Sequence, residues 1–258
     1  MKLNDLRITN AIVGAYAELF CENVESDVLI TGAGPAGLVA ARCLANRGVR
    51  VVVVEKRLST GGGIWGGGML MNRVIVQEEA VEILDDFGVR HRPAKDAEKL
   101  HVVDSVELAS ALTLRALQAG ATILNGVSVE DVRMADGRVN GLVVNWTPIK
   151  QIELHVDPLT LGARAVIDAT GHEAVVVNLV QRRNLKLRTP SGQMIGEQPM
   201  NADEGETFVV EHTGEVFPGL YVTGMAVCAS FGGSRMGPIF GGMLLSGRKV
   251  ALQVAKGL

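Results

Sequence analysis

The sequence predicts an α/β fold built around a parallel core sheet. Residues 27–31 (DVLIT) and 50–55 (RVVVVE) are short apolar runs, which are typical of strands buried on both faces of a parallel sheet. Residues 35–47 lie between these runs, are rich in Ala and Leu, and predict a helix. The strand, the helix and the second strand form a βαβ unit, which begins the sheet.

The other helices are predicted from apolar periodicity and capping residues. The first is amphipathic, spans 9–21 and has Thr9 as its cap. Its apolar face consists of Ile12, Val13, Tyr16, Leu19 and Phe20. Further helices are expected at 77–87, 105–119 and 241–256.

The second half of the chain predicts more strands and one surface segment. Residues 127–133 and 138–146 flank Asp136-Gly137, a dipeptide typical of a tight hairpin. Strands are also expected at 151–156, 163–169 and 219–223. The polar residues 183–206 contain Gly and Pro and predict a surface excursion. We therefore expect a β-rich insertion around 127–156.

Composition argues against several classes of partner. The net charge of −3 gives no electrostatic attraction for nucleic acid or for an anionic membrane. No apolar run approaches the ~18 residues of a membrane span, and the first residues lack the apolar core of a secretory signal. The three cysteines are few, odd in number and far apart, so we expect a reducing, cytoplasmic location without disulfides.

A glycine motif, GAGPAG at 32–37, follows the first buried strand and opens the helix after it. Gly32 permits a tight turn, Gly34 lets the backbone approach a pyrophosphate, and Gly37 lets the helix pack close to the sheet. Glu55 ends the second strand, where an acid accepts hydrogen bonds from a ribose diol and disfavours a 2′-phosphate. We therefore predict a Rossmann-type dinucleotide-binding fold, with 1–258 as one domain that prefers NAD or FAD to NADP.

Residues 60–68 (TGGGIWGGG) contain two glycine triplets. A flexible surface loop would have this composition. Backbone that wraps against a ligand would have it too, because glycine has no side chain to keep the ligand away. We favour the ligand-binding interpretation.

Four polar residues in the second half are candidates for chemistry. His155 and Asp157 lie in LHVDP, where the alternation of a strand would point both to one side. His172 lies in TGHE after the strand at 163–169, and Arg235 lies in RMGP. Asp157 as a turn residue and His172 as a helix cap are simpler interpretations. A carboxylate with an imidazole suits Fe(II) or another divalent first-row metal, and a guanidinium can clamp a carboxylate.

Taken together, these residues and their neighbours resemble the thiamine thiazole synthase family over almost the whole length of the chain. The landmarks are DVLITGAGPAG, the Glu55-Lys56 pair, GGGIWGGGML, VVNW, HVDP, DATGHE and RMGPIFGGMLLSG. GAGPAG is shared with many flavoproteins, whereas GGGIWGGG, TGH and RMGP together are much more specific. The resemblance implies an iron-dependent transferase that makes ADP-5-ethyl-4-methylthiazole-2-carboxylate from NAD and glycine for thiamine biosynthesis.

The resemblance also implies roles for individual residues. Together with the glycine motif, it assigns cofactor binding to Gly32, Gly34, Ala36, Gly37, Glu55, Lys56, Gly63, Val129, His155, Val156, Asp157 and Met225. Asp157 and His172 match the family's iron ligands, which meet across a subunit boundary in a ring-like homo-octamer. Met225 and Arg235 match positions near the glycine-derived carboxylate, so Arg235 is the substrate-binding residue.

His155 bears on the source of sulfur. Eukaryotic relatives carry at this position a cysteine that donates its own sulfur once, and a histidine has no sulfur to give. Cys21, Cys43 and Cys228 all lie outside the segment. We therefore expect free sulfide to be the donor, Fe(II) to deliver it, and turnover to be multiple. His155 is the expected catalytic residue, and proton transfer and metal contact are both open as its role.

Two other functions and one cysteine stay open. A flavin-dependent oxidoreductase is the main alternative, because GAGPAG followed by a strand-ending Glu is common in FAD enzymes. A non-catalytic NAD sensor would need only the first half of the chain. Cys228 lies near the predicted glycine site, and such a residue is more often a small buried hydrophobe than a reactive thiol.

Overall fold

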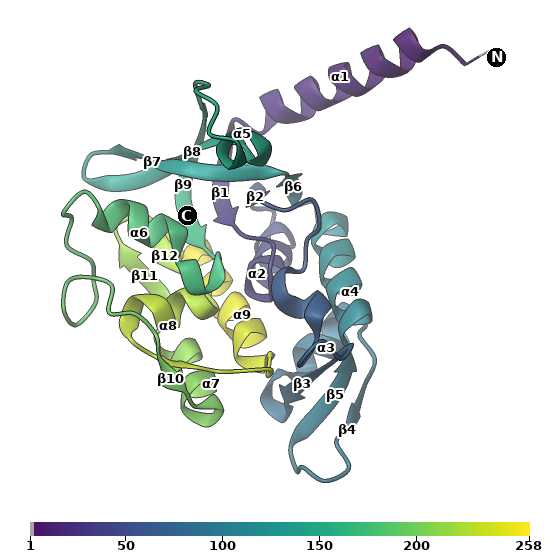
Figure 1. Cartoon of the computed structure of the whole chain (residues 1–258), viewed down its shortest axis with the longest axis vertical. Helices are drawn as coiled ribbons and strands as arrows, with labels where there is room; N and C mark the ends of the chain where they lie inside the picture. The colour runs from purple at the N-terminus through teal and green to yellow at the C-terminus, as the bar shows by residue number, and fades with distance from the viewer. Residues whose placement is uncertain (1–2) are drawn as a thin grey trace.

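The computed structural model describes residues 3–258, and its main sheet has eight strands (Figure 1). These strands are β1 (Glu25–Thr31), β2 (Val51–Glu55), β6 (Thr122–Asn125), β7 (Val127–Ala135), β8 (Arg138–Trp146), β9 (Leu159–Asp168), β11 (Gly214–Phe217) and β12 (Leu220–Val222). The order β12-β9-β1-β2-β6 is parallel throughout. β8 joins β9, β7 joins β8 and β11 joins β12 in antiparallel pairs. The predicted parallel core with additional β-structure is therefore confirmed.

Helices and two small sheets surround this sheet. The helices are α1 (Asp5–Glu22), α2 (Pro35–Ala45), α3 (Val81–Phe87), α4 (Ser105–Gln118), α5 (Thr147–Gln151), α6 (Val175–Gln181), α7 (Ala202–Glu211), α8 (Met225–Phe231) and α9 (Gly241–Gly257), with 3-10 helices η1 (Gly62–Gly66), η2 (Glu78–Ala80) and η3 (Gly171–Glu173). One small sheet has the order β3 (Arg73–Gln77), β5 (Leu100–Asp104), β4 (His91–Pro93), and the other pairs β10 (Gln198–Met200) with β13 (Ser234–Arg235). Among residues 3–258, no helix is long and apolar enough to cross a membrane.

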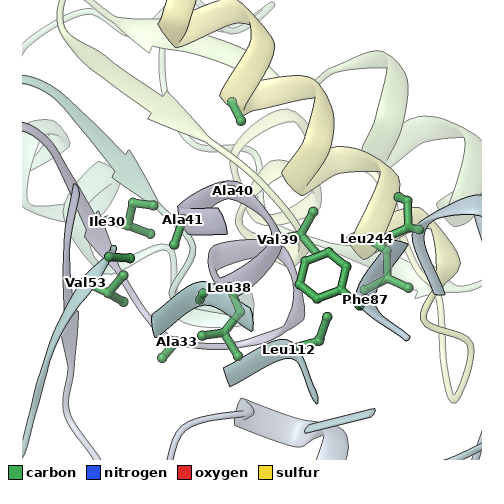
Figure 2. Packing of buried hydrophobic residues seen from close by; sticks show 14 of the residues in the cluster. Ile30, Ala33, Leu38, Val39, Ala40, Ala41, Val53, Phe87, Leu112 and Leu244 are labelled. Carbon is green, nitrogen blue, oxygen red and sulfur yellow. The ribbon is translucent and has the colours of Figure 1, made fainter. Parts of the chain in front are cut away.

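The central strands are buried on both faces. Ile30 of β1 and Val53 of β2 pack with residues of α2, α4 and α9, including Leu38 and Leu244 (Figure 2). Leu29, which precedes Ile30, points to the opposite face, where residues of β7, β8, α6 and α8 form a second cluster. Two-sided burial explains why β1 and β2 consist largely of Val, Leu and Ile rather than alternating apolar and polar residues.

The strand predicted at 151–156 is wrong. Residues Thr147–Gln151 form α5, whose first turn contains Pro148, a residue well suited to a helix start. The chain then runs irregularly until β9, and Glu153 has a φ of 54°, which is incompatible with an extended strand. His155 and Asp157 therefore do not share one face of a strand.

The first helix also differs from its prediction. It begins at Asp5 rather than at residue 9, because the Asn4 side chain caps it by accepting hydrogen bonds from the backbone N–H groups of Leu6 and Arg7. None of its residues is buried, and Figure 1 shows the helix projecting from the body of the protein. Its predicted apolar face is thus left uncovered in a single chain.

Candidate functional site

A cavity of about 920 Å³ opens at the carboxyl ends of β1, β2 and β9. β1 lies between β2 and β9 in the sheet. The chain after β1 leads to β2 on one side, and the chain after β9 leads to β12 on the other, so the two connections run in opposite directions. Such a topological switch point is where open α/β sheets bind their ligands. Thr31 lies at this point and lines the cavity, and its buried hydroxyl has no hydrogen-bond partner within residues 3–258.

The glycine turn forms one wall of the cavity. Gly32 has a φ of 99°, and a Cβ there would lie 2.5 Å from the carbonyl oxygen of Ala169, so a side chain is excluded on two grounds. A Cβ on Gly34 would meet no atom within 4 Å, which leaves open space toward the cavity that Gly34 lines. Gly37 does not line the cavity; its missing side chain lets α2 approach the backbone of Gly32.

Glu55 braces this turn from the next strand. Its side chain is buried, its Oε2 accepts a hydrogen bond from the N–H of Ala33 at 2.8 Å, and its Oε1 accepts one from Arg57 at 2.8 Å. Each carboxylate oxygen has a second lone pair, so Glu55 can still accept from a ligand in the cavity that it lines. The exposed neighbour Lys56 forms an ion pair with Glu173 at 2.7 Å, and both residues line the cavity as well.

The glycine-rich loop at 60–68 packs against the same turn. Gly61 donates a hydrogen bond from its N–H to the carbonyl oxygen of Ala33 at 2.7 Å, and Gly62–Gly66 forms η1. A Cβ on Gly62 would lie 3.0 Å from Gly34 Cα. Gly62 and Gly63 both line the cavity, so the loop is folded over the glycine turn rather than free at the surface.

Buried Asp168 shapes the turn that carries His172. It accepts four hydrogen bonds, from the N–H and hydroxyl of Thr170 and from the N–H groups of Val176 and Val177. Burial raises the pKa of Asp168, while these hydrogen bonds oppose that shift. The strand end, η3 and the start of α6 are thereby joined through one side chain, which the sequence analysis did not single out.

His172 and Arg235 also line the cavity, as do buried Met225 and Val129. His172 Nδ1 lies 2.6 Å from Oε1 of Glu197, and Arg235 Nε lies 3.7 Å from Oε2 of the same carboxylate. The segments around 172 and 235 are therefore brought together, although they lie far apart in the sequence. Glu197 was also missed, because it stands in the polar segment predicted to be a surface excursion.

The segment with His155, Val156 and Asp157 lies elsewhere. These three residues are exposed and do not line the cavity that holds Gly32, Ala36 and the other predicted residues. Within residues 3–258, no three His, Cys, Asp or Glu side chains are grouped so as to bind a metal ion. One chain thus brings His172 to the cavity without Asp157.

Cys228 is buried in α8 and does not line the cavity. Desolvation, with smaller contributions from the charges of Glu197 and Glu206, raises its pKa to about 12. A thiol in this environment stays protonated at neutral pH and is a poor nucleophile. The structure therefore favours the interpretation of Cys228 as a small buried hydrophobe.

Known proteins match this chain over its whole length. The sequence profile of the Thi4 family matches residues 9–240. A thiamine thiazole synthase from Thermococcus kodakarensis is 53% identical over 256 residues, covering 99% of each chain. Another from Methanothermobacter thermautotrophicus is 51% identical over 259 residues, covering 100% of each. The crystal structure of Thermovibrio ammonificans THI4 is similar with a TM-score of 0.96 at 47% identity, covering 99% of both chains.

Proposed function

Because the chain belongs to the Thi4 family, we propose that it is a thiamine thiazole synthase that works as a transferase. Its substrates are NAD, glycine and sulfide, and its product is ADP-5-ethyl-4-methylthiazole-2-carboxylate. One observation carries this proposal: the glycine turn, Glu55, His172 and Arg235 all line a single cavity. A dinucleotide site and groups suited to chemistry on a carboxylate substrate therefore face the same space.

The ADP part of NAD fits the wall formed by the glycine turn. Gly34 leaves open space for a pyrophosphate, and α2 begins at Pro35, so its free N–H groups and partial positive charge face the phosphates. The buried carboxylate of Glu55 accepts hydrogen bonds from the ribose hydroxyls. The unpartnered hydroxyl of Thr31 gives the ligand one further polar contact.

Arg235 is the group that binds the carboxylate of glycine. Its guanidinium is about half exposed at the cavity, and a planar fork of donors matches a carboxylate bidentately. Buried Met225 supplies an apolar wall beside it, which excludes water from the condensing carbons. Lys56 and Glu173 form an ion pair elsewhere in the cavity lining, and this pair restricts the position of the nucleotide.

His172 fits a metal site in this cavity, because its ring lines the space and imidazole suits Fe(II). Asp157 of the same chain does not reach the cavity, so the carboxylate ligand comes from a second copy. When bound, Fe(II) supplies Lewis-acid activation for the incorporation of sulfide. His155 lies two residues before Asp157 and enters the shared site with it, where it transfers a proton.

The exposed apolar surface supports assembly into a homo-octamer with shared active sites. Leu6, Ile12 and Val13 of α1 are 75%, 64% and 61% exposed, and Ile152 and Leu154 are 66% and 55% exposed. Tyr16 of α1 contacts Trp146 at the end of β8 with ring centroids 5.7 Å apart, which places α1 next to the strand end that leads into α5 and then into the segment with Ile152 and Leu154. Apolar surface of this extent is typical of an interface between subunits.

Co-expression of two inactive variants tests the shared site. Asp157→Ala and Arg235→Ala are each expected to be inactive alone. If each site takes Asp157 from one subunit and Arg235 from another, random assembly restores about a quarter of the wild-type activity, because one site in four then has both residues. Co-expressed variants that stay inactive while the wild type turns over would contradict sharing.

Sulfide is the sulfur donor in this proposal because His155 stands where a sulfur-donating cysteine would be needed, and no cysteine of the same chain lines the cavity. Cys21, Cys43 and Cys228 are free, and none of the three lines the cavity. Unpaired cysteines also suit the reducing cytoplasm. Since His155 has no sulfur to transfer, the protein is not consumed by turnover.

The decisive assay incubates the purified protein anaerobically with NAD, glycine, Fe(II) and sulfide, and identifies the released molecules by mass spectrometry. Several equivalents of adenylated carboxythiazole per chain, dependent on sulfide, are expected. The mass of the protein should be unchanged after turnover, and a dehydroalanine at any cysteine would refute sulfide as the donor. Glu82→Gln, which breaks an exposed ion pair with Arg248, is a control expected to retain activity.

A flavin-dependent oxidoreductase is not favoured, because the full-length relatives are thiamine thiazole synthases. Purified protein that carries a flavin and forms no thiazole would reverse this preference. Only the dinucleotide-binding interpretation of the fold would then survive.

A further inference from the structure

Glu197 connects two residues of the cavity without lining it. Its Oε1 lies 2.6 Å from His172 Nδ1, and its Oε2 lies 3.7 Å from Arg235 Nε. The Glu197 side chain is 14% exposed, whereas those of His172 and Arg235 are 55% and 59% exposed. One largely buried carboxylate therefore stands behind two side chains that reach into the cavity.

The backbone holds Glu197 in place from both sides. The N–H of Gly196 donates to the carbonyl oxygen of Ala229 at 3.0 Å, and the N–H of Gln198 donates to that of Gly233 at 3.0 Å. β10 follows directly and pairs with β13, the strand that contains Arg235. The backbone on both sides of Glu197 is consequently held by the fold, and the Glu197 carboxylate contacts the two more exposed side chains in front of it.

We propose that Glu197 is a positioning residue that orients His172 toward the metal and Arg235 toward the substrate carboxylate. This inference rests on the proposed function of the cavity. Metal-binding imidazoles usually donate their second N–H to a carboxylate or carbonyl, and loss of that partner weakens metal binding. Glu197 supplies this partner to His172 and, with its other oxygen, faces the guanidinium.

The contact with Glu197 determines which nitrogen of His172 can bind a metal. An ionised carboxylate only accepts hydrogen bonds, so Nδ1 carries the proton between the two groups. In the neutral ring, Nε2 then keeps its lone pair. Nε2 has no hydrogen-bond partner within residues 3–258, so it is the atom left for the metal.

The contact with Glu197 restrains the Arg235 side chain without occupying the two terminal nitrogens of its guanidinium. A separation of 3.7 Å between Nε and Oε2 is an ion pair but is too long for a hydrogen bond. The two terminal nitrogens have no ion-pair or hydrogen-bond partner among residues 3–258. They are therefore free to bind an incoming carboxylate bidentately while Glu197 holds the guanidinium from the Nε side.

Two variants separate these effects in the full-length protein. Glu197→Ala removes both contacts. Glu197→Gln keeps an oxygen that can accept from His172 Nδ1, but it removes the charge that faces Arg235. Glu82→Gln is the matched control, because it neutralises an exposed glutamate that pairs with Arg248 at 2.7 Å outside the cavity.

Metal binding is measured anaerobically without substrates, by titrating Co²⁺ and following its absorption bands. Glu197→Ala is expected to bind Co²⁺ about 10–100-fold more weakly than the wild type, as is typical for loss of a residue that orients a metal ligand. Glu197→Gln should lose less affinity for Co²⁺, and in the assay with Fe(II) it should raise KM for glycine more than it lowers kcat. Glu82→Gln should match the wild type in both measurements.

The outcomes distinguish this inference from the proposed function. If wild-type protein binds no Co²⁺, or binds it equally well after His172→Ala, the proposed metal site fails and the inference fails with it. If binding depends on His172 but Glu197→Ala binds as tightly as the wild type, only the inference is overturned. An unchanged or lower KM for glycine in Glu197→Gln overturns the part that concerns Arg235.

Discussion

Gly34 and Gly37 flank the start of α2, and the structure assigns them different reasons for being glycine. A Cβ on Gly34 would meet no atom within 4 Å, and its φ of −79° suits any residue. A Cβ on Gly37 would lie 2.1 Å from the carbonyl oxygen of Gly32 and 3.3 Å from Ala169 Cβ. We therefore predict that Gly37→Ala destabilises the fold and that Gly34→Ala does not.

The expected loss of stability in Gly37→Ala follows from the short distance at Gly37. A close C···O contact is about 3.3 Å, so a separation of 2.1 Å requires the helix and the turn to move apart by about 1.2 Å. Overpacking costs about 1–3 kcal/mol, and a clash this close with backbone lies at the upper end, about 2–3 kcal/mol, while replacing Gly by Ala in a helix regains about 1 kcal/mol. A net loss of about 1–2 kcal/mol corresponds to a fall of about 2–8 °C in Tm for a protein of this size.

Thermal melting and NAD titration calorimetry of the two variants test this reasoning. Gly34→Ala should melt like the wild type but bind NAD more weakly, because its methyl group enters the space proposed for the pyrophosphate. Gly37→Ala melting at the wild-type temperature would refute the close packing of α2 on Gly32. Wild-type NAD affinity in Gly34→Ala would refute the position of the pyrophosphate.

Three further predictions concern single side chains. Cys228→Ser should retain full activity, and iodoacetamide should leave Cys228 unlabelled in the native protein at pH 8, because burial holds its thiol protonated. Burial raises the pKa of Glu206 above the unfolded value of about 4.3, so its contribution to stability is full below that pH and is lost as pH rises through the folded pKa. In urea unfolding, the unfolding free energy of the wild type minus that of Glu206→Gln should therefore decrease as pH rises above about 4.3. Asp104→Ala removes the cap of α4 and should cost about 0.5–2 kcal/mol of unfolding free energy.

The first half of the fold was predictable because its signals are local. β1 and β2 are apolar runs buried on both faces, and the motif at 32–37 contains the turn and the helix start within a few residues. The sheet of β3, β5 and β4 was missed, since β4 has only three residues, one of them Pro93. α8 was missed because seven residues are too short for a periodic pattern, and Gly224 opens it without a side-chain cap.

The residues of the candidate site also fall into those with a local sequence signal and those without one. Gly32, Gly34 and Glu55 are placed by backbone and strand geometry that the motif itself specifies. Glu197 has no such signal, because its position depends on pairing between β10 and β13, which are distant in the sequence. The prediction that His155 and Asp157 share one face of a strand was wrong, because the sequence pattern over 151–156 could not reveal the positive φ of Glu153.

The separation of Asp157 from the cavity has a consequence for how activity depends on assembly. His172 and Arg235 are held by contacts within one chain, so the NAD and glycine parts of the proposed site form whenever the chain folds. The segment 152–158 is exposed, and α1, which contacts the end of β8 through Tyr16 and Trp146, buries none of its residues. Burial of both against a neighbouring copy would order this segment and bring its carboxylate to the metal in one step. In the proposed shared site, assembly is a condition for chemistry, whereas nucleotide binding requires only residues of one chain.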